Sequence, residues 1–185
     1  GFGGLELVKG LADAPVDVVL VDANNFHTFQ PLLYQVATAG LDSDDIAAPV
    51  RGIVHNLHNV DVRLGKVVDI DFDDRRLLLD DGPTIPYDRL VLAAGAVTNT
   101  FGVPGVDEHG FGLKSLEDSL RLRQHLLRQF ERASVDPTLV EQGALDVIIA
   151  GGGPTGVELA GGIAELYRNV LAHDFPTLDV RKARV

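Results

Sequence analysis

The chain has 185 residues, of which 27 are acidic and 16 are basic, giving a net charge of −11. This acidity argues against nucleic acid as a partner and against docking to anionic lipid through a basic patch. The lack of cysteine excludes disulfides, thiolate catalysis and thiolate metal sites, and no apolar run reaches the roughly 18 residues of a membrane span. We therefore expect a soluble chain without a metal site.

Both ends of the sequence look cut. Gly1-Phe2-Gly3-Gly4 opens the chain without a preceding strand, and residues 178–185 close it where a new strand is predicted to begin. The sequence is therefore interpreted as an internal fragment of a longer protein. Its length suits one or two domains.

The first residues have the pattern of the tail of a dinucleotide-binding fingerprint. Gly1 and Gly4 take the places of its second and third glycines, and apolar residues at helical spacing follow over 5–12. Residues 16–21 are typical of a buried strand. Asp22 closes that strand 21 residues after Gly1, where a carboxylate accepts hydrogen bonds from an adenosine ribose. The alternative is a flexible end followed by a turn residue.

The segment 24–40 mixes aromatic and apolar residues with polar ones, including His27 and Gln30. It is predicted as a loop. It either closes over a flat aromatic ring system, with Gln30 as a polar contact, or simply buries its aromatic side chains. His27 by itself is more typical of a structural histidine than of a proton donor.

The acidic residues 42–45 predict the N-cap and first turn of a helix that starts near Ile46 and reaches Leu57. Arg51 on this helix either contacts a phosphate or lies on the solvated face. The solvated position is the simpler expectation.

From Val60 onward the apolar pattern takes a period of two, which predicts a small β-meander. Its turns are rich in aspartate and glycine. The predicted strands are 60–64, 66–71, 76–79 and 84–87, with turns at 73–74 and 80–83.

Residues 89–95 predict a second buried parallel strand, ending in Ala94 and Gly95. These small residues would let a backbone approach a ligand closely. The sequence 102–105, Gly-Val-Pro-Gly, then marks a domain boundary.

A long helix is predicted from Ser115, the expected N-cap, to about residue 133. Its inward side chains are expected to be Leu116, Leu120, Leu127 and Phe130, and its four arginines a solvated face. Asp136-Pro137 ends it.

The most informative stretch is 145–162. Its β-branched run at 147–149 predicts a buried parallel strand, followed by Gly151-x-Gly153-x-x-Gly156 and a helix-forming sequence. The three glycines suit the tight turn, the close approach of a pyrophosphate and the packing of helix on strand. The phosphates would lie at the helix N-terminus. The alternative is a packed glycine turn that binds no nucleotide.

Three blocks of the sequence, 1–5, 29–38 and 151–161, resemble the type II NADH dehydrogenases. The resemblance covers nearly the whole chain, and 29–38 is its most specific part. It implies a two-dinucleotide-binding-domain flavoprotein: a membrane-associated NADH:quinone oxidoreductase with one FAD and no metal.

The resemblance also implies which residues contact each cofactor. Those expected to hold FAD are Gly1, Phe2, Gly3, Gly4, Asp22, Ala23, Gln30, Val67, Ala94 and Gly95. Those expected to face the NADH pyrophosphate are Gly151, Gly152, Gly153, Pro154, Thr155 and Gly156.

Glu158 is the expected catalytic residue. Two residues after Gly156, it is predicted in the first turn of a helix, where the dipole alone stabilises a carboxylate. By the resemblance it faces the flavin and the quinone, where an apolar environment would favour its protonated form and suit a proton relay.

The predicted fold class is α/β. An FAD-binding Rossmann-like part with a β-meander occupies 1–105, a connecting helix 106–143, and the start of an NAD(P)-binding Rossmann-like domain 144–185. NADH and a quinone are the expected partners, with membrane contact on the cytoplasmic face through a part outside this sequence, and a possible homodimer.

Two other functions stay open. One is a soluble reductase that passes electrons to ferredoxin or another protein, and the other is a cofactor-binding sensor or scaffold without turnover. The choice between NADH and NADPH is not readable, since the deciding residue is expected beyond Val185.

Overall fold

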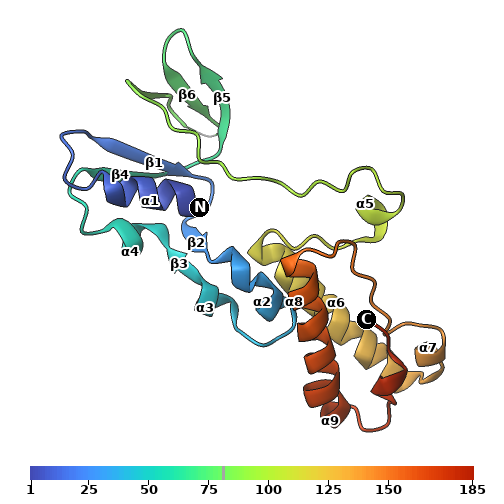
Figure 1. Cartoon of the computed structure of the whole chain (residues 1–185). Helices are drawn as coiled ribbons and strands as arrows, with labels where there is room; N and C mark the ends of the chain where they lie inside the picture. Colours follow the sequence, from blue (N-terminus) through green and yellow to red (C-terminus); the bar gives the residue numbers. More distant parts are fainter. Residues whose placement is uncertain (81) are drawn as a thin grey trace. The chain divides into compact units, whose positions relative to one another are not determined.

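The computed structural model describes residues 1–80 and 82–185. Asp81, part of the predicted turn 80–83, therefore lies outside the described residues. The chain divides into two compact units. The first unit comprises Gly1–Thr28 and Ala47–Ala96, and the second comprises Phe29–Ile46 and Val97–Val185 (Figure 1).

A parallel pair of strands lies at the centre of the first unit. β1 (Val18–Asp22) pairs with β4 (Val60–Leu64), from Val18 opposite Val60 to Asp22 opposite Leu64. The predicted strand over 16–21 and the predicted helix after Gly1 are both confirmed. The core is completed by α1 (Phe2–Gly10) and α4 (Val50–Val54), and its buried side chains are Leu5, Val8, Val50, Val54 and Val62.

The prediction that residues 60–64 open the β-meander is wrong. Val62 is buried in the core beside α1 and α4, and a parallel neighbour satisfies the strand's backbone groups. The meander itself is confirmed with three antiparallel strands: β5 (Val67–Asp71), β6 (Arg76–Leu79) and β7 (Ile85–Pro86).

Segment 24–40 and the stretch after it differ from the prediction. An antiparallel pair forms from β2 (Phe26–Thr28) and β3 (Ala47–Pro49), so the expected loop begins as a strand. The expected helix from Ile46 to Leu57 is interrupted by β3, because β2 offers that segment a strand partner. The acidic cap belongs to a shorter helix, α3 (Ser43–Ile46), which ends where the predicted one begins.

The second unit is helical. Segment 24–40 continues into η1 (Gln30–Leu32) and α2 (Leu33–Ala37), where Leu33, Val36 and Ala37 are buried. The remaining elements are α5 (Val106–His109), α6 (Leu116–Val135), α7 (Thr138–Glu141), α8 (Pro154–Glu165), the π-helical η2 (Leu166–Leu171), α9 (Ala172–Asp174) and η3 (Val180–Lys182).

The longest helix, α6, confirms its predicted cap. The Asp118 amide donates to Ser115 Oγ at 3.1 Å, and the Ser115 amide donates to Asp118 Oδ2 at 2.9 Å, which is a reciprocal capping box. Its buried face was only partly predicted. Phe130 is fully buried, but its companions are Ser119, Leu122, Leu126 and Ala133.

Leu116 and Leu120 instead pack against a separate cluster around Leu33, Val36 and Ile46. Leucines occur on several faces of α6. The neighbouring helix, which the sequence pattern does not reveal, decides which of them become fully buried.

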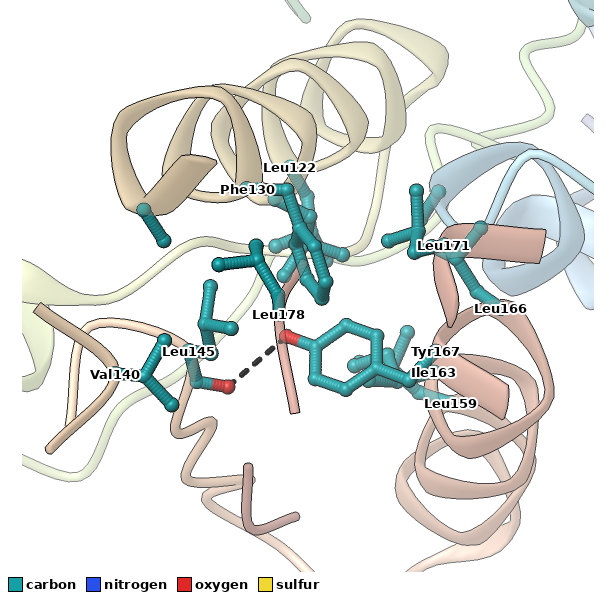
Figure 2. Close-up of a cluster of buried hydrophobic side chains, with 13 residues drawn as sticks. Leu122, Phe130, Val140, Leu145, Leu159, Ile163, Leu166, Tyr167, Leu171 and Leu178 are labelled. Atoms are coloured by element: carbon teal, nitrogen blue, oxygen red, sulfur yellow. Dashed lines mark hydrogen bonds between the residues drawn. The ribbon is translucent and has the colours of Figure 1, made fainter. Parts of the chain in front are cut away.

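The main core of the second unit centres on Phe130 and Tyr167 (Figure 2). Their rings meet edge to face with centroids 4.8 Å apart. The Tyr167 hydroxyl donates to the Leu145 carbonyl at 3.1 Å, so the buried polar atom is satisfied. Burial raises the pKa of Tyr167 to about 12, which keeps the hydroxyl protonated as a donor.

Three predicted strands are not formed. Residues 89–95 and 147–149 have no strand neighbour in the described chain, and residues 178–185 contain the short helix η3. A strand exists only where another backbone pairs with it. Val147 has one such bond, from its amide to the Arg184 carbonyl at 2.8 Å, and Ile148 next to it is 95% exposed.

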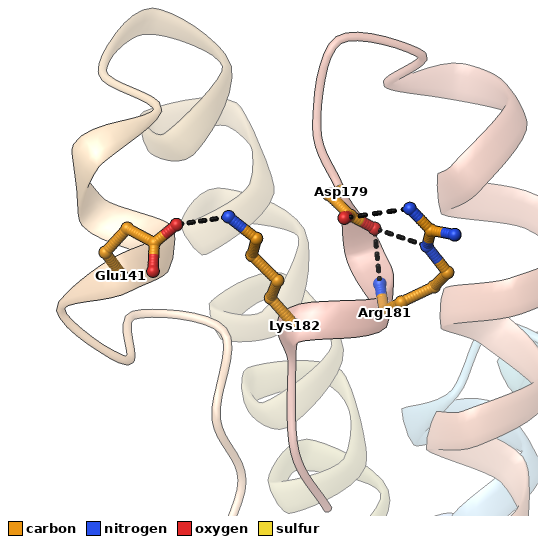
Figure 3. A network of polar contacts seen from close by, with 4 residues as sticks. All are labelled: Glu141, Asp179, Arg181 and Lys182. Carbon is orange, nitrogen blue, oxygen red and sulfur yellow. Dashed lines mark hydrogen bonds and ion pairs between the residues drawn. The ribbon is translucent and has the colours of Figure 1, made fainter.

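Ion pairs form among the last residues and also tie them to α7 and to the loop before α8. Lys182 pairs with Glu141 at the end of α7, and Arg181 pairs with Asp179 at 2.7 Å (Figure 3). The Arg184 side chain donates to Asp146, and that hydrogen bond is the main reason why the pKa of Asp146 lies below its usual value. These contacts bring residue 184 beside residue 147.

No helix in the described part of the chain combines the length and apolar character needed to cross a membrane. Within residues 1–80 and 82–185, no group of three or more His, Asp or Glu side chains is arranged to hold a metal ion.

Candidate functional site

The first glycine turn lies at the carboxyl end of the β1–β4 pair. Gly1 is the N-cap of α1, and its nitrogen is 3.9 Å from Asp22 Oδ2 at the end of β1. Asp22 Oδ1 also accepts from the Asn24 amide at 2.9 Å, which orients the carboxylate. Gly1 and Asp22, 21 positions apart in the sequence, thus lie close together in the structure.

Gly4 is the closely packed member of this turn. A Cβ at Gly4 would lie 3.7 Å from Ala93 Cβ and 4.0 Å from Leu20 Cδ1, whereas Gly1 and Gly3 have no atom within 4 Å of such a position. Gly4 therefore faces Leu20 of β1 and Ala93, at distances where a Cβ would make ordinary van der Waals contact. The open space at Gly1 and Gly3 fits a ligand that approaches the backbone.

His27 lies beside this turn and contacts Phe2. The two rings meet edge to face with centroids 4.9 Å apart. Burial lowers the pKa of His27, so the imidazole is neutral at neutral pH. This geometry supports the interpretation of His27 as a structural histidine.

The first unit also has an open cavity of about 330 Å³ that the sequence did not reveal. None of the predicted cofactor-binding residues lines it. Arg51 does, but its guanidinium donates to the Val62 carbonyl at 2.6 Å. Arg51 is exposed on α4, as expected for a solvated helix charge, and its hydrogen bond also ties α4 to β4. The lining residues are Arg51, Arg63, Leu64, Leu79, Gly82 and Pro83.

The second glycine turn leads into α8 in the second unit. Gly153 is the N-cap and Pro154 the first helical residue, a position that suits proline because no amide is needed there. Gly151 has φ +123°, which favours glycine. A Cβ at Gly156 would fall far inside van der Waals contact with the Gly151 carbonyl and 3.3 Å from Ile149 Cγ2.

The phosphate side of this turn is open. Gly152, Gly153 and Thr155 are exposed, and no atom lies within 4 Å of a Cβ placed on either glycine. The start of a helix with free amides and an open backbone has the shape and polarity to hold a pyrophosphate. The turn and the helix after it are formed, but the predicted strand before them is not.

Glu158 is the fifth residue of α8. The prediction that it lies in the first turn is therefore wrong by one turn, since the helix begins at Pro154. Its side chain is exposed and has no hydrogen-bond or ion-pair partner among the described residues. The favourable effect of the helix dipole falls off within the first turn, so the dipole does not account for an acid there.

The other predicted residues are distributed over both units. Gln30 in the second unit accepts from Lys114 Nζ at 3.3 Å. In the first unit, Ala23, Ala94 and Gly95 are exposed, and Val67 lies in β5. The resemblance implies that the backbone of these residues contacts FAD, which stays a prediction.

The glycine turns are typical of proteins that bind two dinucleotides, and comparison with known proteins assigns the class. Residues 1–179 match the family model of the pyridine nucleotide-disulphide oxidoreductases. The chain belongs to this family. The α/β fold class expected from the sequence is thereby confirmed.

Among individual relatives, the type II NADH:quinone oxidoreductase Ndh of Mycobacterium tuberculosis is 44% identical over 190 residues, covering 100% of this chain and 41% of the relative. The external alternative NAD(P)H-ubiquinone oxidoreductase B4 of Arabidopsis thaliana mitochondria is 35% identical, covering 98% of this chain and 32% of the relative. The chain thus spans less than half the length of these relatives.

Among solved structures, NDH2 of Plasmodium falciparum in complex with RYL-552 matches 90% of this chain and 35% of its own, with a TM-score of 0.80 and 26% identity. NDH2 of the same organism in complex with NADH gives a TM-score of 0.77. These similarities agree with the resemblance to type II NADH dehydrogenases seen in the sequence.

Proposed function

We propose that this chain forms part of an FAD-dependent NADH:quinone oxidoreductase. The observation that carries the proposal is the second glycine turn, where Gly156 has no room for a side chain and Gly152 and Gly153 are open to a ligand. Such a turn leaves α8 free to bind a pyrophosphate. The similarity to type II NADH:quinone oxidoreductases supports the choice of substrates.

The first turn is assigned to FAD. Gly1, Phe2, Gly3 and Gly4 would face the FAD pyrophosphate, Asp22 the adenosine ribose, and Gln30 with the backbone of Ala23, Val67, Ala94 and Gly95 the rest of the cofactor. Gly151 to Gly156 would hold NADH. The corresponding domains are 1–105 for FAD and 144–185 for the nucleotide, joined by 106–143.

The proposed reaction needs few acid or base groups from the protein. FAD, held by the residues named above, would supply the chemistry that takes a hydride from NADH and passes electrons to a quinone. The residues of this chain orient the two cofactors, and their helix N-termini stabilise the phosphate charges. Glu158, exposed and unpaired within the described residues, is the candidate to deliver a proton to the quinone.

We also propose that the whole protein is peripheral to the membrane on its cytoplasmic face. Attachment would come through a part of the protein outside this chain, and the protein could form a homodimer. Flotation of the full-length protein with liposomes, and its molar mass by light scattering, test the two points separately.

The acceptor preference of the full-length protein tests the function. We expect bound FAD to bleach with NADH and to be reoxidised by a quinone analogue faster than by ferredoxin. Preference for ferredoxin would indicate a soluble reductase instead. Bound FAD that NADH does not bleach would indicate a sensor or scaffold.

Glu158→Gln tests the catalytic assignment. The substitution keeps size and removes the carboxylate, so quinone turnover should fall about 10-fold or more, in line with the loss of a general acid. FAD content and the rate of flavin bleaching by NADH should not change. Unchanged quinone kinetics would remove Glu158 from the mechanism.

A further inference from the structure

The crossing of α2 and α8 in the second unit is unusually close at one point. A Cβ at Gly162 of α8 would lie 2.9 Å from Thr38 Oγ1 and 3.0 Å from Thr38 Cγ2. Apolar atoms normally stay about 3.5–4.0 Å apart. Glycine at position 162 therefore sets how near the two helices approach.

Thr38 cannot easily move aside. It is 7% exposed, and its hydroxyl donates to the Tyr34 carbonyl at 2.9 Å, so the side chain is held in one rotamer. Val36 and Ala37, just before it, are fully buried. A larger residue at 162 would have to shift the backbone of one helix rather than rotate a side chain.

Each helix leads to a residue that the proposed function uses. Along α8, Gly162 follows Gly156 by six residues, about 9 Å of helix. On the other side, α2 directly follows η1, whose first residue, Gln30, accepts a hydrogen bond from Lys114 beside the α6 cap. The Gly162–Thr38 crossing thus joins the segment assigned to FAD to the turn assigned to NADH.

We propose that Gly162 and Thr38 are positioning residues for hydride transfer. Within the second unit, their contact fixes the separation between the segment of Gln30 and the turn Gly151–Gly156, and so how near the nicotinamide comes to the part of FAD assigned to Gln30. The inference rests on the proposed function. Neither residue touches a cofactor in this scheme.

The test replaces Gly162 by alanine in the FAD-loaded, full-length protein. The limiting rate of flavin bleaching by NADH should fall about 10-fold, since misplacement by about 1 Å costs up to about 100-fold in enzymes. The NADH concentration for half-maximal rate should change little, because Gly151–Gly156 is untouched. The visible circular dichroism of bound flavin should also change, which gives a readout independent of turnover.

Two further variants separate positioning from general damage. Gly161→Ala is the matched control: it adds the same methyl group to the next residue of α8, where no atom lies within 4 Å, and the rate should stay at the parent value. Thr38→Ala in the Gly162→Ala background removes the atoms that the new methyl meets. It should restore the rate to within about twofold, as expected for directly coupled sites.

The outcomes are distinguishable. Gly162→Ala with a lower melting temperature but the parent bleaching rate and flavin spectrum would overturn the inference, as would failure of Thr38→Ala to restore the rate. If Gly162→Ala does not fold, the double variant alone decides: it must fold and bleach at nearly the parent rate. A parent protein that NADH does not bleach would contradict the proposed function itself.

Discussion

The two glycine turns share a sequence pattern but differ in how tightly the structure constrains them. In the first unit, a Cβ at Gly4 would lie at 3.7 Å from its nearest neighbour, which is ordinary van der Waals contact. In the second unit, a Cβ at Gly156 would overlap the Gly151 carbonyl. The neighbour is a side-chain methyl in one case and a backbone carbonyl in the other.

The difference shows that the third glycine of a fingerprint can be under a strong steric constraint in one turn and a weak one in another. At Gly156 the turn folds back on its own helix, so the glycine is needed to make the turn itself. At Gly4 the neighbours are Leu20 of β1 and Ala93, and a Cβ would make only ordinary contact with them, so the packing leaves room for alanine. The strands differ too, since β1 is paired and residues 147–149 are not.

The largest expected effect is a loss of stability in the core that packs against α8, the helix of the second turn. Phe130 is fully buried against Tyr167 in the core beneath α8. Phe130→Ala should lower the free energy of unfolding by about 3–5 kcal/mol, as in other cores. Urea denaturation followed by circular dichroism measures it. Phe72→Ala, at a side chain 70% exposed, should change stability by less than about 0.5 kcal/mol.

The comparison itself is tested at Gly156. Gly156→Ala should raise the NADH concentration for half-maximal flavin bleaching about 100-fold, because the turn that would face the phosphates must open. FAD content should remain that of the parent. An unchanged NADH dependence would mean that the turn does not bind the nucleotide.

The capping box of α6 should have a smaller effect on stability. Ser115→Ala removes the acceptor of the Asp118 amide and should cost about 1 kcal/mol. The measurement is the melting temperature of Ser115→Ala. The control is Ser134→Ala, which makes the same change near the other end of α6. Equal melting temperatures for the two variants would contradict the role of the cap.

The same cap predicts a dependence on pH. Burial raises the pKa of Asp118, but hydrogen bonds from the Ser115 and Lys114 amides outweigh it and hold the pKa below its usual value. A lowered native pKa stabilises the fold above the unfolded value of about 3.9 and loses that contribution as pH falls through the native value. The melting-temperature difference between the parent and Asp118→Asn should therefore shrink as the pH falls below the unfolded value of about 3.9.

The smallest expected effect is at Gly4. Gly4→Ala meets only van der Waals contact, so FAD affinity should change by less than about threefold, or 0.7 kcal/mol. Fluorescence titration with FAD measures this. If Gly4→Ala weakened FAD binding as much as Gly156→Ala weakens NADH binding, the two turns would be equally constrained. That result would contradict the difference described above.

Several features followed from the sequence because their cause is local. The helix after Gly1, the strand ending at Asp22, the cap at Ser115 and the turn before Pro154 all depend on residues a few positions apart. Local backbone preference, apolar spacing and capping are sufficient to predict such elements.

Only the tertiary structure decided the features that depend on distant partners. Residues 60–64 have the alternating pattern of a meander strand, yet they pair with β1 because Val62 packs against α1 and α4. Residues 147–149 have the composition of a strand, but a strand requires a paired backbone. The sequence does not predict that Arg51 contacts Val62. It also does not predict that Gly162 contacts Thr38. Those contacts exist because folding brings together residues that the chain keeps far apart.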